Sequence, residues 1–232
     1  MFRHRVVFYT LLSCLIFPLM LSGQEKNPEK IIAEVQKKFN LVKDYQAKVQ
    51  IIVDVEFLKV PENEATIFFR QPDKVQVKTE GFALIPKEGL NFSPAKMFSG
   101  SVTSLYQMEE KFEGHDCAVL KIIPLDANAP FVLSTVWIDR KEMIIRKVEA
   151  TTKESGSYQL RLQYGNYASY ALPSKMVLEF DLKNFTLPKG FNGEFNRKQS
   201  QDKEKKTKGT VTLKYTDYRV NKGIPDSVFD GK

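Results

Sequence analysis

The side chains best suited to chemistry in this sequence are those of His115 and Cys117, two residues apart after a glycine. Residues i and i+2 of a β-strand lie on the same face, so an imidazole here could activate a thiol as a nucleophile. Such a pair needs a third group to orient the imidazole. The nearby carboxylates belong to Glu109, Glu110 and Asp116, and no spacing links one of them to His115. Gly114-His115-Asp116 is therefore more typical of a solvated turn than of a catalytic dyad.

Other kinds of chemistry have even less support in the sequence. Apart from His4 and Cys14 near its start, the chain has one histidine and one cysteine, and these cannot supply the ligands of a zinc site. The chain has no glycine-rich phosphate loop and no serine in the context of a nucleophile elbow. We therefore predict that the protein is not an enzyme, that it has no catalytic residues, and that it uses no metal and no cofactor.

The first residues have the pattern of an export signal. A basic start at Arg3 and Arg5 precedes an apolar stretch over residues 6–21, and Ser22 and Gly23 provide small residues for cleavage. At about 16 residues the stretch is short for a membrane span, which needs about 20. We predict a signal peptide over residues 1–23 and one exported domain over residues 24–232. Two alternatives are an uncleaved anchor and lipidation at Cys14, which ends a lipobox-like phrase.

Composition bounds the mature chain further. Loss of Cys14 with the signal peptide leaves Cys117 alone, so stability must come from the core and not from an intrachain disulfide. A hydrophobic fraction of 42% and an aromatic fraction of 12% indicate a folded protein. Much of the net charge of +7 lies in residues 197–208, a run without apolar side chains. This run is typical of a solvated loop, with contact to an anionic lipid as the alternative; it lacks the interleaved aromatics of a nucleic-acid site.

Hydrophobic periodicity predicts one helix followed by many strands. Asn27-Pro28-Glu29 combines an N-cap, a proline at the first helical position and an acid in the first turn, and apolar residues follow at helical spacing over residues 28–42. The period then changes to two over residues 47–57. Further strands are predicted over residues 65–70, 74–79, 117–124, 131–138, 143–152, 157–164, 175–182 and 209–220.

Short turns between most of these strands favour one meandering antiparallel sheet. Roughly nine to eleven strands in one sheet must curl or close, and eight or more leave room for a ligand inside. The predicted fold class is mainly β (α+β): a curved antiparallel sheet that forms an incomplete β-barrel, with an N-terminal helix and a lid segment.

The aromatic residues of the strands indicate what such a barrel could hold. They could fill the core or line an apolar cavity, and our candidates for the cavity are Phe57, Phe69, Trp137 and Phe180. Residues 81–98 are apolar but interrupted by proline and glycine, which makes them a poor strand. They could plug the core or cover the mouth of the sheet, and the candidates for a lid are Leu84, Phe92, Met97 and Phe98.

Several phrases resemble the LolA/LolB superfamily, in particular LolA-like outer-membrane lipoprotein-sorting proteins. They are Trp137-Ile138-Asp139, Arg146-Lys147-Val148-Glu149, Leu172-Pro173-Ser174-Lys175-Met176, residues 215–229 and Phe69-Arg70-Gln71-Pro72-Asp73. The resemblance implies a half-barrel with a helical lid over an apolar cavity. It also implies a periplasmic carrier in a Gram-negative-type envelope that binds acyl chains of lipoproteins or lipids and moves them toward the outer membrane.

The implied partners are an acylated lipoprotein or a lipid, with an inner-membrane release complex and an outer-membrane acceptor as further candidates for a monomeric carrier. The alternative is an envelope-stress sensor or interaction module of the same fold. One departure concerns the lid. The family implies an arginine directly before the proline as a latch, whereas this chain has Gln71 there and Arg70 one position earlier, on the opposite face of the strand. Arg70 is therefore the only candidate for a latch.

Overall fold

The computed structural model describes residues 25–55, 61–79, 97–98, 100–126, 129, 131–153, 156–181 and 208–230. Their elements, in chain order, are α1 (Pro28–Phe39), β1 (Asp44–Asp54), β2 (Asn63–Arg70), β3 (Lys74–Thr79), β4 (Val102–Phe112), β5 (His115–Pro124), β6 (Phe131–Asp139), β7 (Ile145–Thr152), β8 (Ser157–Tyr164), η1 (Ala168–Tyr170), β9 (Pro173–Asp181), β10 (Lys208–Val220) and η3 (Asp226–Val228).

The helix α1 begins where the sequence predicts. The side chain of Asn27 accepts a hydrogen bond from the backbone N–H of Lys30 at 3.0 Å, and Pro28 takes the first helical position, where no N–H is needed. The helix ends at Phe39, three residues before the predicted end. Its buried face consists of Ile31, Ile32, Val35 and Phe39.

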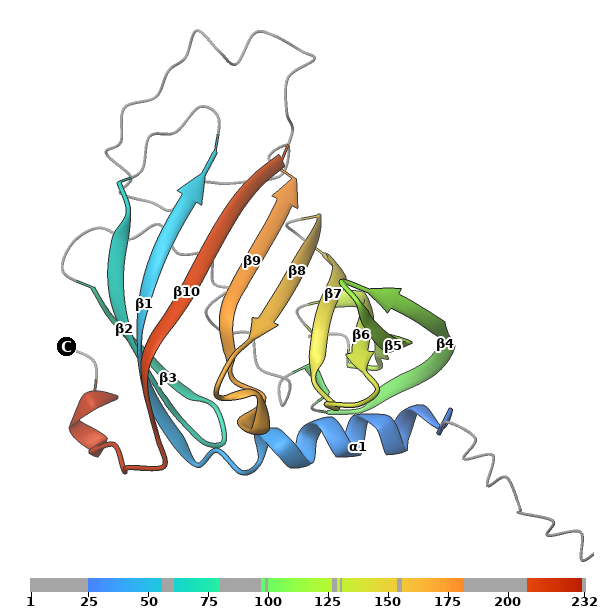
Figure 1. The fold of residues 1–232 in the computed structure, drawn as a ribbon, viewed down its shortest axis with the longest axis horizontal. Coiled ribbons are helices and arrows are strands. Elements are labelled where there is room, and N and C mark those ends of the chain that lie inside the picture. The colour runs from blue at the N-terminus through green and yellow to red at the C-terminus, as the bar shows by residue number, and fades with distance from the viewer. Residues whose placement is uncertain are drawn as a thin grey trace, which may run out of the picture.

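All ten strands form one antiparallel sheet in the order β3-β2-β1-β10-β9-β8-β7-β6-β5-β4. Strands that follow one another in the sequence are neighbours in the sheet, except for β3 and β4, which form its two edges. The first strand, β1, also pairs with the last, β10. The sheet is strongly curved but not closed into a barrel (Figure 1). The predicted incomplete barrel is confirmed, and the segment between β3 and β4, which contains the predicted lid, connects its two edges.

The strand β4 was absent from the sequence prediction. Its burial alternates weakly, and most of its 11 residues are exposed, because it has a neighbour on one side only. Val102 and Tyr106 pack against the inner cluster, but most of the strand is exposed, and it therefore lacks the strong apolar period by which strands are detected. The predicted turn at residues 114–116 also moves: the tight turn is Glu113-Gly114, both with positive φ, and His115 begins β5.

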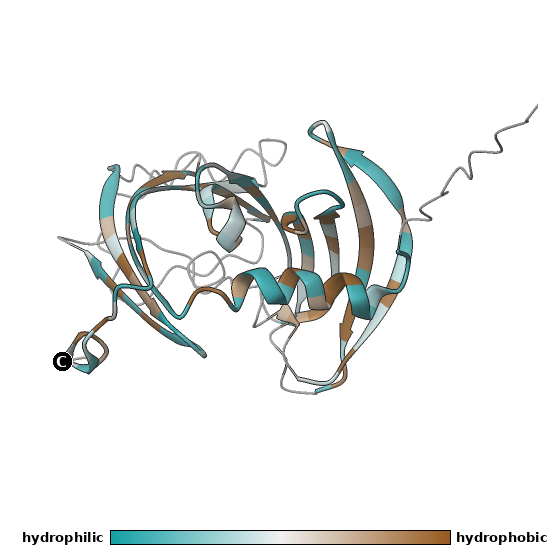
Figure 2. Cartoon of the chain, turned by 60° about the horizontal axis from the view of Figure 1, so that its bottom comes forward, coloured by the Kyte–Doolittle hydropathy of each residue, from teal (hydrophilic) through white to brown (hydrophobic). Residues whose placement is uncertain are grey.

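The two faces of the sheet differ in character. We call the side that packs against α1 the inner face and the opposite side the outer face. A row of paired residues crosses the middle of the inner face with side chains at most 3% exposed: Val136, Val148, Leu160, Leu178 and Val211. Figure 2 shows α1 lying across the opening of the curved sheet. Within the described residues, no helix is long and apolar enough to span a membrane.

Candidate ligand-binding face

The inner face is one continuous apolar surface. Strands β1, β2 and β5–β10 all contribute to a single cluster of buried residues, together with the apolar face of α1. The alternation of each strand produces this surface, because every second side chain points to the same side. The curved sheet thus surrounds its apolar side chains.

Polar contacts hold both ends of α1 in place over this face. Near its start, Arg140 Nη2 donates to the carbonyl of Glu25 at 2.6 Å, and Ser104 Oγ donates to the Glu29 carboxylate at 2.9 Å. Near its end, Lys38 Nζ lies 3.7 Å from the Glu142 carboxylate and also donates to the backbone carbonyl of that residue. Arg140 and Glu142 both belong to the turn between β6 and β7, so this turn fixes the position of the helix.

Three of the predicted site residues lie within the inner cluster. Phe69 stacks on Tyr45 with ring centroids 5.2 Å apart and contacts Phe39 of α1 at 5.5 Å. Met97 and Phe98, predicted as lid residues, are buried in the same cluster. The structure thus brings these three side chains together with the helix, although their roles toward a ligand remain predictions.

Phe180 lies at the rim of the inner face. Its cross-strand neighbours are Tyr158 on β8 and Gly209 on β10. Phe180 itself is half-buried and packs against the inner cluster. On the opposite, outer face of the same strands lies a pocket of about 480 Å³, lined mainly by the paired row Thr135, Glu149, Gln159 and Glu179.

Trp137 lies on the outer face, apart from the other candidates. Its neighbours there are Cys117, Val119 and Phe112. The indole Nε1–H donates to Glu110 at 3.0 Å, and the ammonium of Lys147 lies 3.9 Å from the ring centroid. Val136 and Ile138, its neighbours in β6, belong to the inner cluster, so the side chain of Trp137 points to the other side of the sheet.

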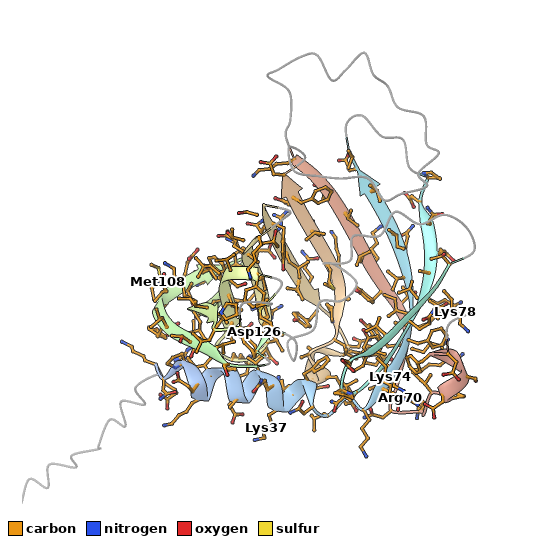
Figure 3. All side chains as sticks on the ribbon, turned by 180° about the vertical axis from the view of Figure 1, so that it is seen from behind. Lys37, Arg70, Lys74, Lys78, Met108 and Asp126 are labelled. Carbon is orange, nitrogen blue, oxygen red and sulfur yellow. The ribbon has the colours of Figure 1, made fainter. Side chains whose placement is uncertain are left out.

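The remaining lid and cavity candidates, Phe57, Leu84 and Phe92, lie outside the described residues. Arg70 is described, and it contacts the C-terminal segment. Its Nη1 donates to the carbonyl of Ile224 at 3.1 Å, its Nη2 bonds the carboxylate of Asp226, and its guanidinium lies 4.9 Å from the ring centroid of Phe229. Figure 3 shows Arg70 beside Lys74 at this end of the sheet. As expected, Arg70 points away from the inner face.

Sequence reasoning missed a group of tyrosines on the inner face. Tyr218 stands at its centre, with ring centroids 5.0 Å from Tyr167, 5.6 Å from Tyr45 and 5.8 Å from Tyr215. Burial raises the pKa values of Tyr45, Tyr215 and Tyr218 above their ordinary value. The Tyr218 hydroxyl donates to the carbonyl of Pro173 at 2.8 Å. Tyr215 and Tyr218 are three residues apart, so alternation alone would place them on opposite faces; an irregularity in the pairing of β10 with β1, where Asp217 has a positive φ, brings both to the inner face.

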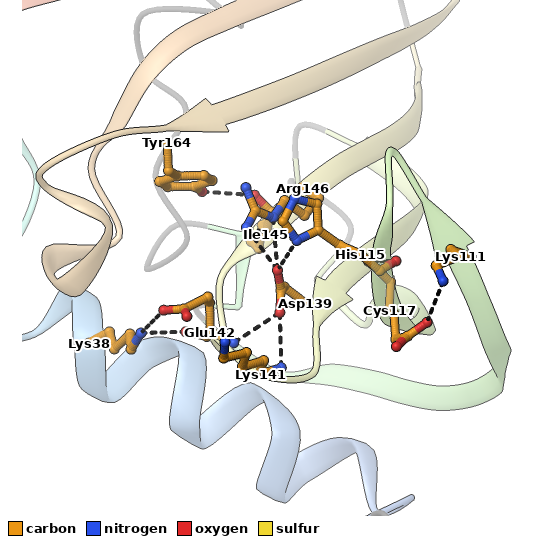
Figure 4. Close-up of polar contacts among 11 residues, drawn as sticks. Lys38, Lys111, His115, Cys117, Asp139, Lys141, Glu142, Ile145, Arg146 and Tyr164 are labelled. Atoms are coloured by element: carbon orange, nitrogen blue, oxygen red, sulfur yellow. Dashed lines mark hydrogen bonds and ion pairs between the residues drawn. The ribbon is translucent and has the colours of Figure 1, made fainter.

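Asp139 is a buried carboxylate, 2% exposed, that is surrounded by polar groups. Its carboxylate accepts hydrogen bonds from the backbone N–H groups of Lys141 and Glu142 and from Nε and Nη2 of Arg146, and His115 Nδ1 lies 2.9 Å away (Figure 4). Desolvation by burial raises the pKa of Asp139, but the donors outweigh it and hold that pKa below its usual value. Asp139 thereby shapes the turn that holds α1.

The arrangement around Cys117 gives no activated nucleophile. Burial, aided by the charge of Asp139, raises the pKa of the Cys117 thiol to about 11. A thiol with such a pKa carries almost no thiolate at neutral pH. The imidazole of His115 is directed at Asp139, and Cys117 Sγ lies 3.6 Å from the backbone carbonyl of His115. Among the described residues, no group of three potential metal ligands is present.

Comparisons with known proteins agree with this architecture. A LolA superfamily protein from Nitrosomonas europaea has a TM-score of 0.55 at 12% identity, covering 88% of this chain and 97% of that chain. A putative outer membrane lipoprotein-sorting protein domain from Vibrio parahaemolyticus has a TM-score of 0.51 at 18% identity, covering 88% and 97%. A DUF1329 family protein from Desulfovibrio piger has a TM-score of 0.56 at 12% identity, covering 89% and 98%.

At these identities the similarity concerns the fold. No curated protein matches the sequence. A family model described as "-like: Uncharacterized protein" matches residues 92–232, which is more than half of the 232 residues. The chain therefore belongs to the family described as "-like: Uncharacterized protein", and its fold is that of the LolA superfamily.

Proposed function

We propose that this protein is a non-enzymatic periplasmic carrier that binds acyl chains of lipoproteins or lipids on its inner face and moves them toward the outer membrane. Residues 1–23 act as the cleaved signal peptide, and residues 24–232 form the single binding domain. The partners are an acylated lipoprotein or a lipid, received from an inner-membrane complex and passed to an outer-membrane acceptor by a monomeric carrier.

The observation that supports this function best is the continuous apolar inner face under an amphipathic helix. Acyl chains need such a surface, because their binding energy comes from removing methylene groups from water, about 0.8 kcal/mol for each one that is fully buried. The polar contacts of α1 and the ordering of the chain oppose this gain. A carrier benefits from that opposition, since its cargo must also be released.

The rim of the inner face at Phe180 is the proposed entrance. Tyr158 and Ala150 are paired in the same cross-strand row and continue the apolar surface from Phe180 toward β7 on the inner face. An acyl chain can enter such a site with its polar end left in water. The LolA-like fold and the family's resemblance to lipoprotein-sorting proteins support the same function.

The decisive experiment combines native mass spectrometry of protein from its own host with lipid extraction of what co-purifies. A stoichiometric acylated lipoprotein or lipid supports the carrier. Phe180→Ala, at the entrance, is then compared with Phe68→Ala, a half-buried phenylalanine of the outer face whose ring lies under Lys78. We expect binding of a fluorescent fatty acid to weaken about tenfold in Phe180→Ala only. An empty protein that binds no fatty acid would contradict the proposal.

A further inference from the structure

A second pocket lies away from the inner face and plays no part in the proposed acyl-chain site. It has a volume of about 690 Å³ and opens between the β4–β5 turn, the β6–β7 turn and the end of β8. The side chains that matter most in its lining are His115, Asp139, Arg140, Lys141, Arg146 and Tyr164. Figure 4 shows most of these groups around Asp139.

The acidic side chains of this pocket are already engaged. Asp139 accepts four hydrogen bonds from Arg146 and the turn. Glu142 is paired with Lys38 of α1, and Asp116 lies 3.9 Å from Lys111. Carboxylates with such partners repel an incoming anion far less than free ones do.

The basic side chains have donors to spare. Arg140 is 7% exposed: its Nη2 donates to the carbonyl of Glu25, its Nε lies 3.3 Å from Glu109, and its Nη1 is enclosed without a hydrogen-bond partner in the described part of the chain. Arg146 uses Nε and Nη2 for Asp139, and its guanidinium lies 5.4 Å from the ring centroid of Tyr164. Within the described part of the chain, neither Arg146 Nη1 nor Lys141 Nζ has a side-chain or backbone acceptor.

Because Arg140 Nη1 has almost no solvent-accessible surface, Arg140 contributes its positive charge to the wall of the pocket, whereas Arg146 Nη1 and Lys141 Nζ are the donors that remain for a bound anion. Three positively charged side chains from one short segment, residues 140–146, converge on the same pocket. Hydrogen bonds from charged donors to an oxyanion are stronger than neutral ones, and guanidinium groups match the geometry of phosphate oxygens.

We propose that this pocket is a binding site for a phosphate group, held by Arg140, Lys141 and Arg146. Asp139 acts as the positioning residue, because it orients Arg146 and the backbone of the turn. The volume accommodates either free phosphate or the phosphate of a lipid headgroup. The proposal does not depend on acyl-chain binding, since phosphate alone is sufficient to test it.

The test is an NMR titration of the folded protein with inorganic phosphate at pH 7 and constant ionic strength. We expect saturable shifts of the backbone amides of residues 140–146. Lys141→Gln removes one donor from an exposed side chain and should weaken phosphate binding about five- to tenfold. Lys37→Gln is the matched control, because Lys37 points away from the sheet on the exposed side of α1 (Figure 3) and should change nothing.

The lipid and the free ion are distinguished by repeating the titration with dihexanoyl phosphatidic acid. Tighter binding than that of inorganic phosphate assigns the site to a headgroup, and equal binding assigns it to the free ion. Absence of saturable shifts, or equal weakening by both lysine variants, would overturn the proposal. Fatty-acid binding is measured in Lys141→Gln as well; it should be unchanged, which separates a failure here from a failure of the carrier function.

Discussion

Asp44 and Asn221, which lie 177 residues apart in the sequence, are joined through their backbones and side chains at the base of the sheet. The N–H of Asn221 donates to the carbonyl of Asp44 at 2.9 Å, and Asn221 Oδ1 accepts from the N–H of Lys43 at 2.7 Å. Asp44 Oδ1 in turn accepts from the N–H groups of Lys222 and Gly223. This connection fastens the start of β1 to the end of β10.

Asn221→Ala should destabilise the fold by about 2 kcal/mol, because it removes the hydrogen bonds to the N–H of Lys43 and the carbonyl of Leu41 and places alanine at a φ of 56°. Asn221→Gly tolerates that φ but lacks the carboxamide, so its loss should be smaller than that of the alanine variant. Urea unfolding measures both. An alanine variant within 0.5 kcal/mol of the parent, on the order of a neutral surface substitution, would refute the role of this connection.

Asp139→Asn should lower the free energy of unfolding at pH 7 by about 3–5 kcal/mol, because it leaves the guanidinium of Arg146 buried without its counter-charge. The folded-state pKa of Asp139 is lowered, so the stability that this carboxylate contributes is complete above its unfolded pKa. It disappears as the pH falls through the folded pKa.

The variant should therefore lose part of the acid dependence of stability as well as stability itself. Urea unfolding at a series of pH values from 7 downward measures both. Asp217→Asn, which removes an exposed carboxylate paired with Lys48, is the control and should cost less than 1 kcal/mol, roughly the limit for surface pairs. Equal losses in the two variants would count against Asp139 as the organiser of the turn.

The thiol of Cys117 should resist alkylation in the folded protein at pH 8 and react only on unfolding. Its pKa is raised from 9.0 to about 11 by burial first and by Asp139 second. The folded state therefore keeps a proton that the unfolded state loses, so this contribution to stability is present below pH 9.0 and is lost between pH 9.0 and about 11. Rapid labelling of native protein at pH 8 would show that the thiol is accessible.

Trp137 is the single tryptophan of the chain, and its fluorescence reports on the outer face of the sheet. A brominated fatty acid bound on the inner face should not quench its fluorescence, since quenching by bromine needs close approach and the sheet intervenes. Moving the indole by the pair Trp137→Phe and Phe180→Trp should produce strong quenching. Quenching of Trp137 in the parent protein would place the ligand on the wrong side of the sheet for our proposal.

Lys38→Gln should loosen α1, whereas Lys37→Gln should not. The two lysines are adjacent in sequence, but Lys38 bonds Glu142 of the β6–β7 turn and Lys37 pairs only with Glu34 of the same helix. Loss of the contact at the end of α1 should raise amide hydrogen exchange over residues 28–39 and speed the release of a fluorescent fatty acid. The same exchange rates in both variants would mean that this contact does not restrain the helix.

The sequence by itself determined much of the local structure. Asn27 and Pro28 mark the start of α1, and alternation over residues 47–55 predicts a strand with one buried face. Both signals are local, since a cap and a period depend only on neighbouring residues. The same local character explains the failure at β4: most of this edge strand is exposed, so its sequence carries only a weak apolar period.

The tertiary structure decided which of these elements meet. Pairing of β1 with β10 brings Tyr45 against Tyr218, and no local pattern predicts that contact. The tertiary structure also places Phe69 and Trp137 on opposite faces of the sheet, although both are aromatic strand residues that look alike in the sequence. Residues 140–146 likewise acquire their pocket only because β5 and β8 lie nearby. Apolar periodicity determines that a strand has a buried side. What each side chain faces is determined by contacts across the sheet, because these contacts depend on register and curvature.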